Sequence, residues 1–291
     1  MKVEPEFDVM RLIGWAADYL SAKRIVKPRL NAEQLLSHCT GRDRVHLYAY
    51  PEKAVSEEEK ESFVVAVMRR ASREPLQYIV GLKGFRHLDL AVDRRVLIPR
   101  PETEMMVGRA LELLNDIPGH PVAVDIGTGS GCIALSVSRE CPAAVVHATD
   151  LCDSALELAA ANALRLGLDG AVVFHRGDLT EALPVELKGK CDLILSNPPY
   201  VRKNDFLGLP PEVREHEPYR SLVAGPLGTE VHLRLMQQAG QWLSPRGWLL
   251  MEGGEDQMEV LAGWAGKLGY DAVRVLTDLN GLPRVIEMRP L

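Results

Sequence analysis

The sequence lacks the features that mark membrane, secreted and strongly basic proteins. It has no run of about 18 apolar residues, and the N-terminus Met1–Glu6 lacks the basic start and apolar stretch of a signal peptide. Its net charge of −6 excludes an overall electrostatic attraction to nucleic acid, although it leaves a local basic face open. We therefore expect a soluble, cytoplasmic protein without a membrane partner.

Cysteine is also scarce and irregularly placed. The five cysteines are odd in number and form neither a CxxC pair nor a zinc-ligand spacing; they are Cys39, Cys132, Cys141, Cys152 and Cys191. This pattern predicts reduced thiols in an internal protein and no metal site.

A hydrophobic content of 46% over 291 residues is enough for a sizeable core, and the length favours two domains. Residues 1–76 show apolar positions at helical spacing and predict a small all-helical domain. Asn31 with Gln34, and Ser56 with Glu59, are predicted as capping boxes at two helix starts. Nothing in this domain predicts catalysis.

Residues 77–96 change character and predict a linker β-hairpin. The runs Tyr78–Gly81 and Leu88–Val92 are strand-like and flank a loop with Gly84. Two prolines then stiffen the turn 97–104, after which a helix is expected from about Thr103.

Residues 97–291 alternate strands with helices. That order predicts an α/β fold with a doubly wound parallel sheet and right-handed crossovers. The last two strands, near 272–276 and 284–288, are joined by a short loop with Asn280 and Gly281. Such a loop cannot carry a parallel crossover, so these strands are expected to form a terminal antiparallel hairpin, as in class I methyltransferases.

A glycine-rich loop follows the first strand of this sheet. The strand ends at Asp125 and leads into Gly127, Thr128, Gly129, Ser130 and Gly131. Glycines allow a sharp turn and close approach of the backbone to a ligand, but a plain strand-to-helix turn has the same composition. The G-x-G-x-G spacing disfavours NAD and FAD, which use G-x-G-x-x-G.

Two further acidic residues are expected at the same edge of the sheet. Asp150 ends the second strand, where a carboxylate accepts hydrogen bonds from ribose hydroxyls. Asp178 follows the third strand and is placed to accept from an adenine amino group. Each aspartate alone could equally be a helix cap or a solvated strand end, whereas strand ends in this order favour a nucleoside-containing cofactor.

The fourth strand delivers Asn197, Pro198, Pro199 and Tyr200 to that edge. A planar amide or aromatic amine attacks a methyl group poorly because its lone pair is delocalised. The Asn197 side-chain oxygen and the Pro198 carbonyl can grip both N–H protons, and Tyr200 offers a flat face for stacking. Pro199 biases Pro198 away from helical conformation. The motif predicts N-methylation of a planar group without saying which one.

At these motifs the sequence resembles the bacterial release factor glutamine-N5 methyltransferases, the PrmC/HemK family. The resemblance covers nearly the whole chain and rests on these runs: Pro75–Ile79, Gly84–Phe85, Val96–Glu104, Asp125–Gly131, Asp150, Ser196–Tyr200, Glu217–Pro218, Leu222–Gly225, Asp278–Gly281 and Arg284. The Asn-Pro-Pro-Tyr run is shared with DNA adenine methyltransferases, whereas Ile98–Thr103 is more particular to this family.

The resemblance implies S-adenosyl-L-methionine as cofactor, S-adenosyl-L-homocysteine as product, and a fold of helical substrate-docking domain followed by a methyltransferase domain. It places cofactor contacts at 127–131, Asp150 and Asn197, and the substrate glutamine at Asn197, Pro198 and Tyr200. Relatives often carry an aromatic residue where this chain has Leu179, so adenine packing is expected to be aliphatic here. Arg100 and Glu102 have two interpretations: contact with cofactor or substrate, or an ion pair between domains.

Three hypotheses follow. The first is a monomeric enzyme that methylates the glutamine of the Gly-Gly-Gln motif in peptide chain release factors and needs no direct nucleic acid contact. The second is a DNA or RNA adenine N6-methyltransferase, which predicts a base-reading domain and a basic groove. The third is a binding module that retains the fold, which an intact Asn197–Tyr200 run argues against.

Overall fold

The computed structural model describes residues 8–291 and divides them into two compact units. The first unit extends to Leu82 and also includes Pro210–His216, and the second comprises Lys83–Leu209 and Glu217–Leu291. The N-terminal hexapeptide that argues against a signal peptide lies outside the described residues. Among those residues, none of the helices combines the length and apolar character that crossing a membrane requires.

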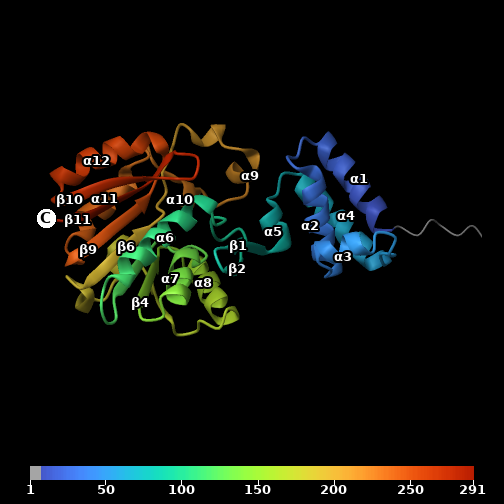
Figure 1. Ribbon diagram of the computed structural model, residues 1–291. Helices are drawn as coiled ribbons and strands as arrows, with labels where there is room; N and C mark the ends of the chain where they lie inside the picture. The colour runs from blue at the N-terminus through green and yellow to red at the C-terminus, as the bar shows by residue number, and fades with distance from the viewer. Residues whose placement is uncertain (1–7) are drawn as a thin grey trace, which may run out of the picture. The chain divides into compact units, whose positions relative to one another are not determined.

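The first unit is helical, and its part up to Leu82 is drawn in blue and cyan in Figure 1. Its buried core includes Ile13, Leu35 and Phe63, each with no measurable exposure, contributed by three different helices. Burial of these amphipathic faces is what holds short helices in place, because isolated helices of this length are marginal in water. The helices are α1 (Val9–Ala22), α2 (Pro28–Thr40), α3 (Arg44–Ala49), α4 (Glu57–Ala71), α5 (Leu76–Val80) and α9 (Pro211–Arg214).

One of the two predicted capping boxes is present. At the start of α4 the Glu59 N–H donates to Ser56 Oγ at 3.2 Å, and the Ser56 N–H donates to the Glu59 carboxylate at 2.9 Å. The box predicted at Asn31 is wrong, because α2 begins earlier, at Pro28. Proline at the first helical position is pre-organised for the helix and needs no N–H partner, so the start lies there.

Asn31 has a different role, inside the first unit's polar network. Its side-chain Nδ2 donates to the carbonyls of Val26 and Lys27 at 3.1 and 3.0 Å, and its Oδ1 accepts from Arg70 Nε at 2.8 Å. Arg70 is buried and also donates to Glu212 at 3.2 Å. A buried guanidinium is tolerated only when its donors are satisfied, so Asn31 and Glu212 together make Arg70 possible.

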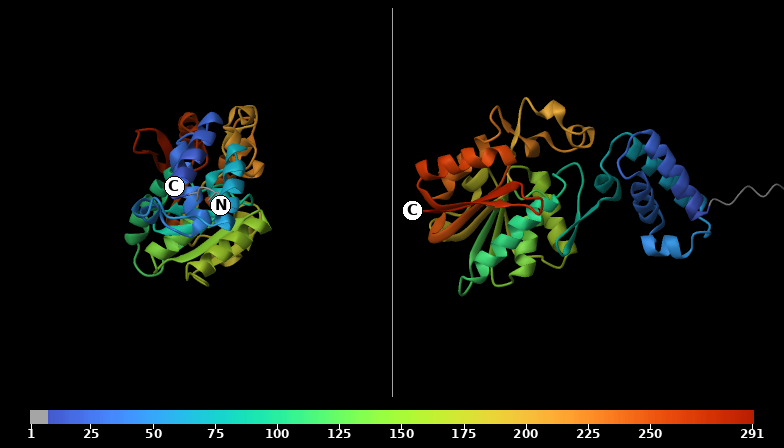
Figure 2. Two further views of the ribbon diagram at one scale, coloured as in Figure 1. Left: turned by 90° about the vertical axis from the view of Figure 1, so that its right-hand side faces the viewer. Right: turned by 45° about the horizontal axis from the view of Figure 1, so that its top comes forward.

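The second unit is built on a seven-stranded sheet with the order β10-β11-β9-β6-β3-β4-β5 (Figures 1 and 2). Its strands are β3 (Val122–Ile126), β4 (Val145–Asp150), β5 (Val172–Arg176), β6 (Cys191–Ser196), β9 (Leu243–Glu252), β10 (Tyr270–Thr277) and β11 (Pro283–Pro290). Strands β5, β4, β3, β6 and β9 are parallel neighbours. The predicted α/β doubly wound fold is confirmed. Only β11 is reversed, since it pairs antiparallel with both β9 and β10.

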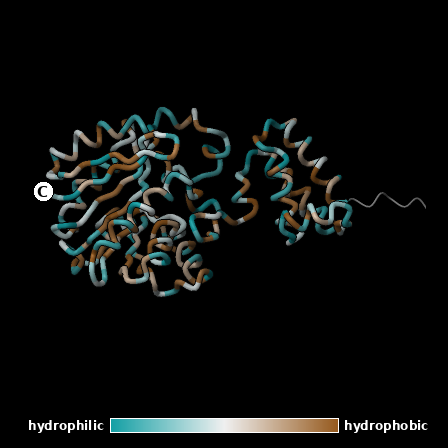
Figure 3. The backbone as a smooth tube through the Cα atoms, viewed as in Figure 1, coloured by the Kyte–Doolittle hydropathy of each residue, from teal (hydrophilic) through white to brown (hydrophobic). Residues whose placement is uncertain are grey.

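Helices cover both faces of this sheet (Figure 1). The strands alternate their burial: Ala123 and Leu250 belong to one core with α6, α7 and α8, whereas Val124 and Leu249 belong to the other with α11 and α12. Figure 3 shows hydrophobic segments along these central strands, as expected for strands buried on both sides. The helices of this unit are α6 (Pro101–Asn115), α7 (Cys132–Glu140), α8 (Asp153–Arg165), α10 (Tyr219–Leu222), α11 (Glu230–Ala239) and α12 (Met258–Lys267).

Two small sheets complete the strands: β1 (Leu82–Phe85) with β2 (Leu88–Ala91), and β7 (Val201–Arg202) with β8 (Val223–Gly225). The strand predicted at Tyr78–Gly81 is wrong, because this segment is α5 and its C-cap. The β-branched and aromatic composition of this segment favours a strand. Tyr78 and Ile79 are both buried, however, and their packing stabilises a helical turn instead.

We expect Asn31→Ala to lower the free energy of unfolding by roughly 2 to 3 kcal/mol, because it strips partners from two carbonyls and a buried guanidinium. Urea denaturation followed by circular dichroism measures the change. The control is Asn204→Ala at an exposed position, which should stay within about 0.5 kcal/mol of wild type. Equal small effects for both variants would show that the Asn31 network contributes nothing.

Candidate functional site

The carboxyl ends of β3, β4 and β6 meet at one edge of the sheet. Ile126 at the end of β3 pairs in register with Thr149 of β4 and with Ser196 of β6. Ser196 Oγ also donates to the Ile126 carbonyl at 2.7 Å, which ties the two strand ends together. The residues that follow these three strands therefore start from the same level, and a ligand can touch all of them.

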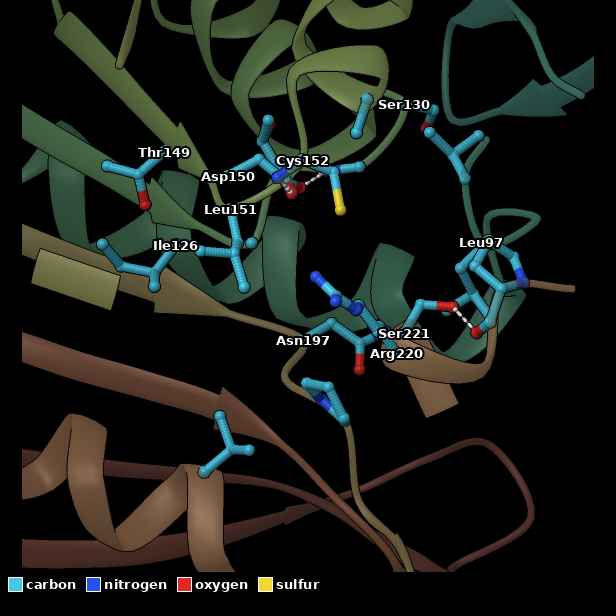
Figure 4. A pocket seen from close by; sticks show the side chains of 18 of the residues that line it. Leu97, Ile126, Ser130, Thr149, Asp150, Leu151, Cys152, Asn197, Arg220 and Ser221 are labelled. Atoms are coloured by element: carbon cyan, nitrogen blue, oxygen red, sulfur yellow. Dashed lines mark hydrogen bonds between the residues drawn. The ribbon is translucent and has the colours of Figure 1, made fainter. Parts of the chain in front are cut away.

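A cavity of about 350 Å³ lies at this edge, within the size range of small-molecule sites. Nine residues predicted from the sequence line it: Gly127, Thr128, Gly129, Ser130, Asp150, Asp178, Leu179, Asn197 and Pro199. Figure 4 shows Asp150, Asn197 and Arg220 around the same space. Gly131, Pro198 and Tyr200 do not line the cavity; Gly131 caps α7 with φ +83°, and Pro198 is buried.

Most backbone N–H groups of the glycine-rich loop are already hydrogen-bonded within the protein. Gly127 and Thr128 N–H both donate to the Thr149 carbonyl at 2.9 Å, and Gly129 N–H donates to the Asp150 carboxylate at 2.9 Å. Gly127 and Gly129 have φ of +77° and +54°, and a Cβ at either position would meet nothing within 4 Å. The loop thus opens space for a ligand and leaves few of its own N–H groups for a phosphate, which disfavours a pyrophosphate cofactor.

Asp150 and Asp178 differ in how free they are. The Asp150 carboxylate accepts from the N–H groups of Gly129 and Cys152, both at 2.9 Å, and burial raises its pKa. It keeps lone pairs for a further donor in the cavity. Asp178 is paired with Arg234 at 2.6 Å, so only part of its carboxylate is left for an adenine amino group.

Asp125, one strand position below the loop, is fully buried beneath the cavity. Thr128 Oγ1 donates to it at 2.7 Å and the Ala134 N–H at 3.2 Å. Burial raises its pKa to about 7 despite these two hydrogen bonds. Its contacts hold the loop against the start of α7, so its effect on a ligand is exerted through the loop.

Asn197 combines a fixed amide nitrogen with an unsatisfied oxygen. Its Nδ2 donates to Thr103 Oγ1 at 3.2 Å, whereas its Oδ1 is buried and has no hydrogen-bond partner among the described residues. Asn197 and Thr103 both line the cavity. A buried acceptor without a partner costs free energy, so the site is built to receive a donor at this oxygen.

Thr103 was not singled out by the sequence, and neither was the residue that holds it. Its hydroxyl donates to the carboxylate of Glu252 at 2.6 Å. Glu252 ends β9 and is 2% exposed, and burial raises its pKa to about 7 although the Thr103 hydrogen bond and nearby Arg284 oppose the shift. In the sequence, Thr103 could have been noticed because it lies in the proline-stiffened run 97–104. Nothing in the sequence distinguished Glu252 from an ordinary acidic residue at the end of a strand.

Tyr200 is held by its backbone. Its N–H donates to the Leu222 carbonyl at 3.1 Å, and its carbonyl accepts from Gln257 Nε2 at 2.8 Å. Burial raises the pKa of its phenol to about 12, so the ring is neutral at physiological pH. Gly228 packs against that carbonyl, where a Cβ would come within 2.6 Å, so this approach requires glycine.

The ion pair of Arg100 does not join the two units, so the interpretation as an ion pair between domains is wrong, while contact with cofactor or substrate stays a prediction. Arg100 lines the cavity, and one terminal nitrogen of its guanidinium contacts both oxygens of Glu217, at 2.7 and 2.8 Å. Both residues belong to the second unit, so this is an ion pair within that unit and beside the cavity. Glu102 does not line the cavity.

The chain is similar to known proteins over nearly its whole length. The chain matches the family models "PrmC N-terminal domain" over residues 11–81 and "Methyltransferase small domain" over residues 109–207. It is 38% identical to a release factor glutamine methyltransferase of Geobacter sulfurreducens, covering 98% of both chains, and 37% identical to one of Rhodopirellula baltica, covering 97% of this chain and 96% of that one.

The third comparison, with solved structures, bears on the fold. The hMettl16 catalytic domain in complex with a MAT2A 3'UTR hairpin matches with a TM-score of 0.56 at 16% identity, over 78% of this chain and 81% of that one. At that identity the likeness shows a shared methyltransferase fold. Among the described residues, no cluster of His, Cys, Asp and Glu suited to a metal ion occurs.

We expect Asp150→Ala to weaken binding of a nucleoside-containing cofactor by about tenfold or more, because it removes the buried acceptor beside Gly129. Isothermal titration calorimetry with S-adenosylhomocysteine measures the dissociation constant. The control is Asp153→Ala, an exposed acid at the start of α8, which should bind as wild type does. Unchanged affinity in Asp150→Ala would exclude this carboxylate from the cofactor site.

The raised pKa of Glu252 predicts a pH dependence of stability. Because the folded state holds this proton up to about pH 7 and the unfolded chain releases it near its ordinary pKa, the stabilisation is present below pH 4.5 and lost as pH rises through 7. Glu252→Gln cannot lose a proton. The free energy of unfolding of the variant relative to wild type should therefore increase by roughly 1 to 3 kcal/mol between pH 5 and pH 8. A pH-independent difference would contradict the assignment.

Proposed function

Because the chain belongs to the release factor glutamine methyltransferase family, we propose that it transfers a methyl group from S-adenosylmethionine to the N5 amide nitrogen of the glutamine in the Gly-Gly-Gln motif of peptide chain release factors. The observation that carries this proposal is the buried, unpaired Oδ1 of Asn197 in a cavity beside the glycine-rich loop. A substrate NH₂ group supplies the donor that this oxygen lacks.

The cavity residues suit the cofactor. When bound, S-adenosylmethionine supplies a methyl group made electrophilic by its positively charged sulfur. Asp150 would accept from ribose hydroxyls, and Leu179 would pack against the adenine as an aliphatic surface. The open space over Gly127 and Gly129 admits the rest of the molecule. Buried acidic groups at this edge, rather than free backbone N–H groups, favour a cationic ligand over a phosphate.

Asn197 would carry the transfer together with Pro198 and Tyr200, which follow it along the chain but do not line the cavity. The Asn197 Oδ1 and the Pro198 carbonyl accept the two protons of the glutamine amide, which orients the nitrogen and favours its more tetrahedral, charge-developed form. Tyr200 stacks against the planar amide as a neutral ring. No carboxylate base is needed at the nitrogen, because an N-methylated amide cation is strongly acidic and gives up its proton to water.

The helical first unit would bind the body of the release factor while the glutamine enters the cavity. A folded protein substrate needs such a second contact, since a single side chain offers little specificity. We further propose that the enzyme works as a monomer in the cytoplasm, where release factors act, and that it requires no direct contact with nucleic acid.

The test is methyl incorporation from labelled S-adenosylmethionine into purified release factor, compared with plasmid DNA and RNA. We expect label on the release factor, located at the Gly-Gly-Gln glutamine by mass spectrometry. The label should be lost when that glutamine is replaced by alanine. Label on nucleic acid alone would replace the proposal with adenine N6-methylation. Cofactor binding without transfer to any of the three would leave a binding module.

We expect Asn197→Ala to lower kcat by on the order of 100-fold or more while the dissociation constant for S-adenosylhomocysteine changes far less, because the lost oxygen acts on the substrate nitrogen. Single-turnover kinetics on the release factor measures the first quantity and calorimetry the second. Asn204→Ala, at an exposed position, should match wild type in both. An unchanged kcat would remove Asn197 from the mechanism.

A further inference from the structure

A buried chain of hydrogen bonds ends on the Asn197 amide. Asn197 Nδ2 donates to Thr103 Oγ1 at 3.2 Å, and the Thr103 hydroxyl donates in turn to Glu252 Oε2 at 2.6 Å. Thr103 is 1% exposed and Glu252 is 2% exposed, so water cannot substitute for either partner. The three residues come from the first turn of α6, the end of β9 and the loop after β6.

Glu252 sets the direction of both hydrogen bonds in the series Asn197–Thr103–Glu252. Above pH 7 the Glu252 carboxyl group is ionised and can only accept, so it takes the single hydroxyl proton of Thr103. The Thr103 oxygen is then left with lone pairs, which can receive an N–H but cannot donate. Asn197 must therefore present its NH₂ group to Thr103, and its Oδ1 is turned to the other side, where it is buried without a partner.

We propose that Thr103 and Glu252 are positioning residues that set the amide orientation of Asn197, so that an oxygen and not an NH₂ group faces the substrate nitrogen. This inference rests on the proposed function, because it is the substrate amide that needs an acceptor. An asparagine amide has nearly the same shape in both orientations, so packing cannot choose between them. Only a neighbour with a defined donor or acceptor can.

The alternative orientation would defeat the transfer. With the amide reversed, the Asn197 NH₂ group would face the NH₂ group of the substrate, donor against donor. The substrate nitrogen would then lose the contact that directs its lone pair, and a misplaced reacting group costs one or more orders of magnitude in rate. Glu252 thus acts on the reaction indirectly: it fixes the Thr103 hydroxyl, and the hydroxyl fixes the Asn197 amide.

The test compares Thr103→Val, Thr103→Ser, Glu252→Leu and the double variant Thr103→Val/Glu252→Leu. Valine keeps the shape of threonine and removes the hydroxyl, serine keeps the hydroxyl, and leucine removes the acceptor that orients it. Tyr270→Phe is the matched control, because it removes a different buried hydroxyl, which donates to the Met236 carbonyl at 2.6 Å in the same unit. Assays are run at pH 8, above the pKa of Glu252.

In this scheme Thr103→Val and Glu252→Leu each lower kcat by about tenfold or more, with the dissociation constant for S-adenosylhomocysteine within about threefold of wild type. Thr103→Ser, which keeps the hydroxyl, retains most of the wild-type kcat. The double variant is no slower than the slower single variant, since both act on one chain of contacts. Tyr270→Phe loses some stability but keeps kcat.

A second readout is independent of turnover. The side-chain NH₂ resonances of Asn197, assigned by their loss in Asn197→Ala, should shift and exchange faster with solvent in Thr103→Val and keep their wild-type behaviour in Thr103→Ser. Wild-type kcat in Thr103→Val, equal slowing in Thr103→Ser, or multiplicative losses in the double variant would overturn the inference. If wild type methylates no release factor, the proposed function fails, and the resonance measurement still decides the orientation of Asn197.

Discussion

The parallel register of β3 with β4 and β6 is the constraint from which the site follows. It sets the ends of three strands at one level, and the Ser196 hydroxyl adds a direct hydrogen bond between two of them. A one-residue slip would turn every side chain of a strand to the opposite face. The glycine-rich loop, Asp150 and Asn197 meet at a single cavity because this register sets the three strand ends at one level.

Buried acids distinguish this cavity from the phosphate sites that other α/β proteins build at the same edge. Asp125 and Asp150 occupy donors of the loop and of α7, and Glu252 occupies the hydroxyl of Thr103. Burial raises the pKa of all three carboxyl groups. The chain thus accepts a cost in stability for acceptors at fixed positions, which is a common property of functional sites.

The chain leaves the second unit after Leu209 and re-enters it at Glu217, and the segment between belongs to the first unit. Glu212 of that segment contacts both Arg70 and Arg73 at 3.2 Å, and Glu217 at its far end holds Arg100 beside the cavity. Two glutamates close together in the sequence therefore have different roles: Glu212 pairs with arginines of the helical unit, and Glu217 pairs with Arg100 beside the cavity.

The sequence by itself determined the fold class, the alternation of strands and helices along the chain and the reversed strand at its end, because period, glycine and proline placement act locally. The order of the strands in the sheet came from the tertiary structure. The sequence could not find Thr103, which lies 94 residues from Asn197, or Glu252, which lies 149 residues from Thr103. Nor could it separate helix from strand at Tyr78, or a cap from a buried partner at Asn31. Those outcomes depend on which groups are buried together, and only the tertiary structure decides that, because the partner of a polar group is found across the fold rather than along the chain.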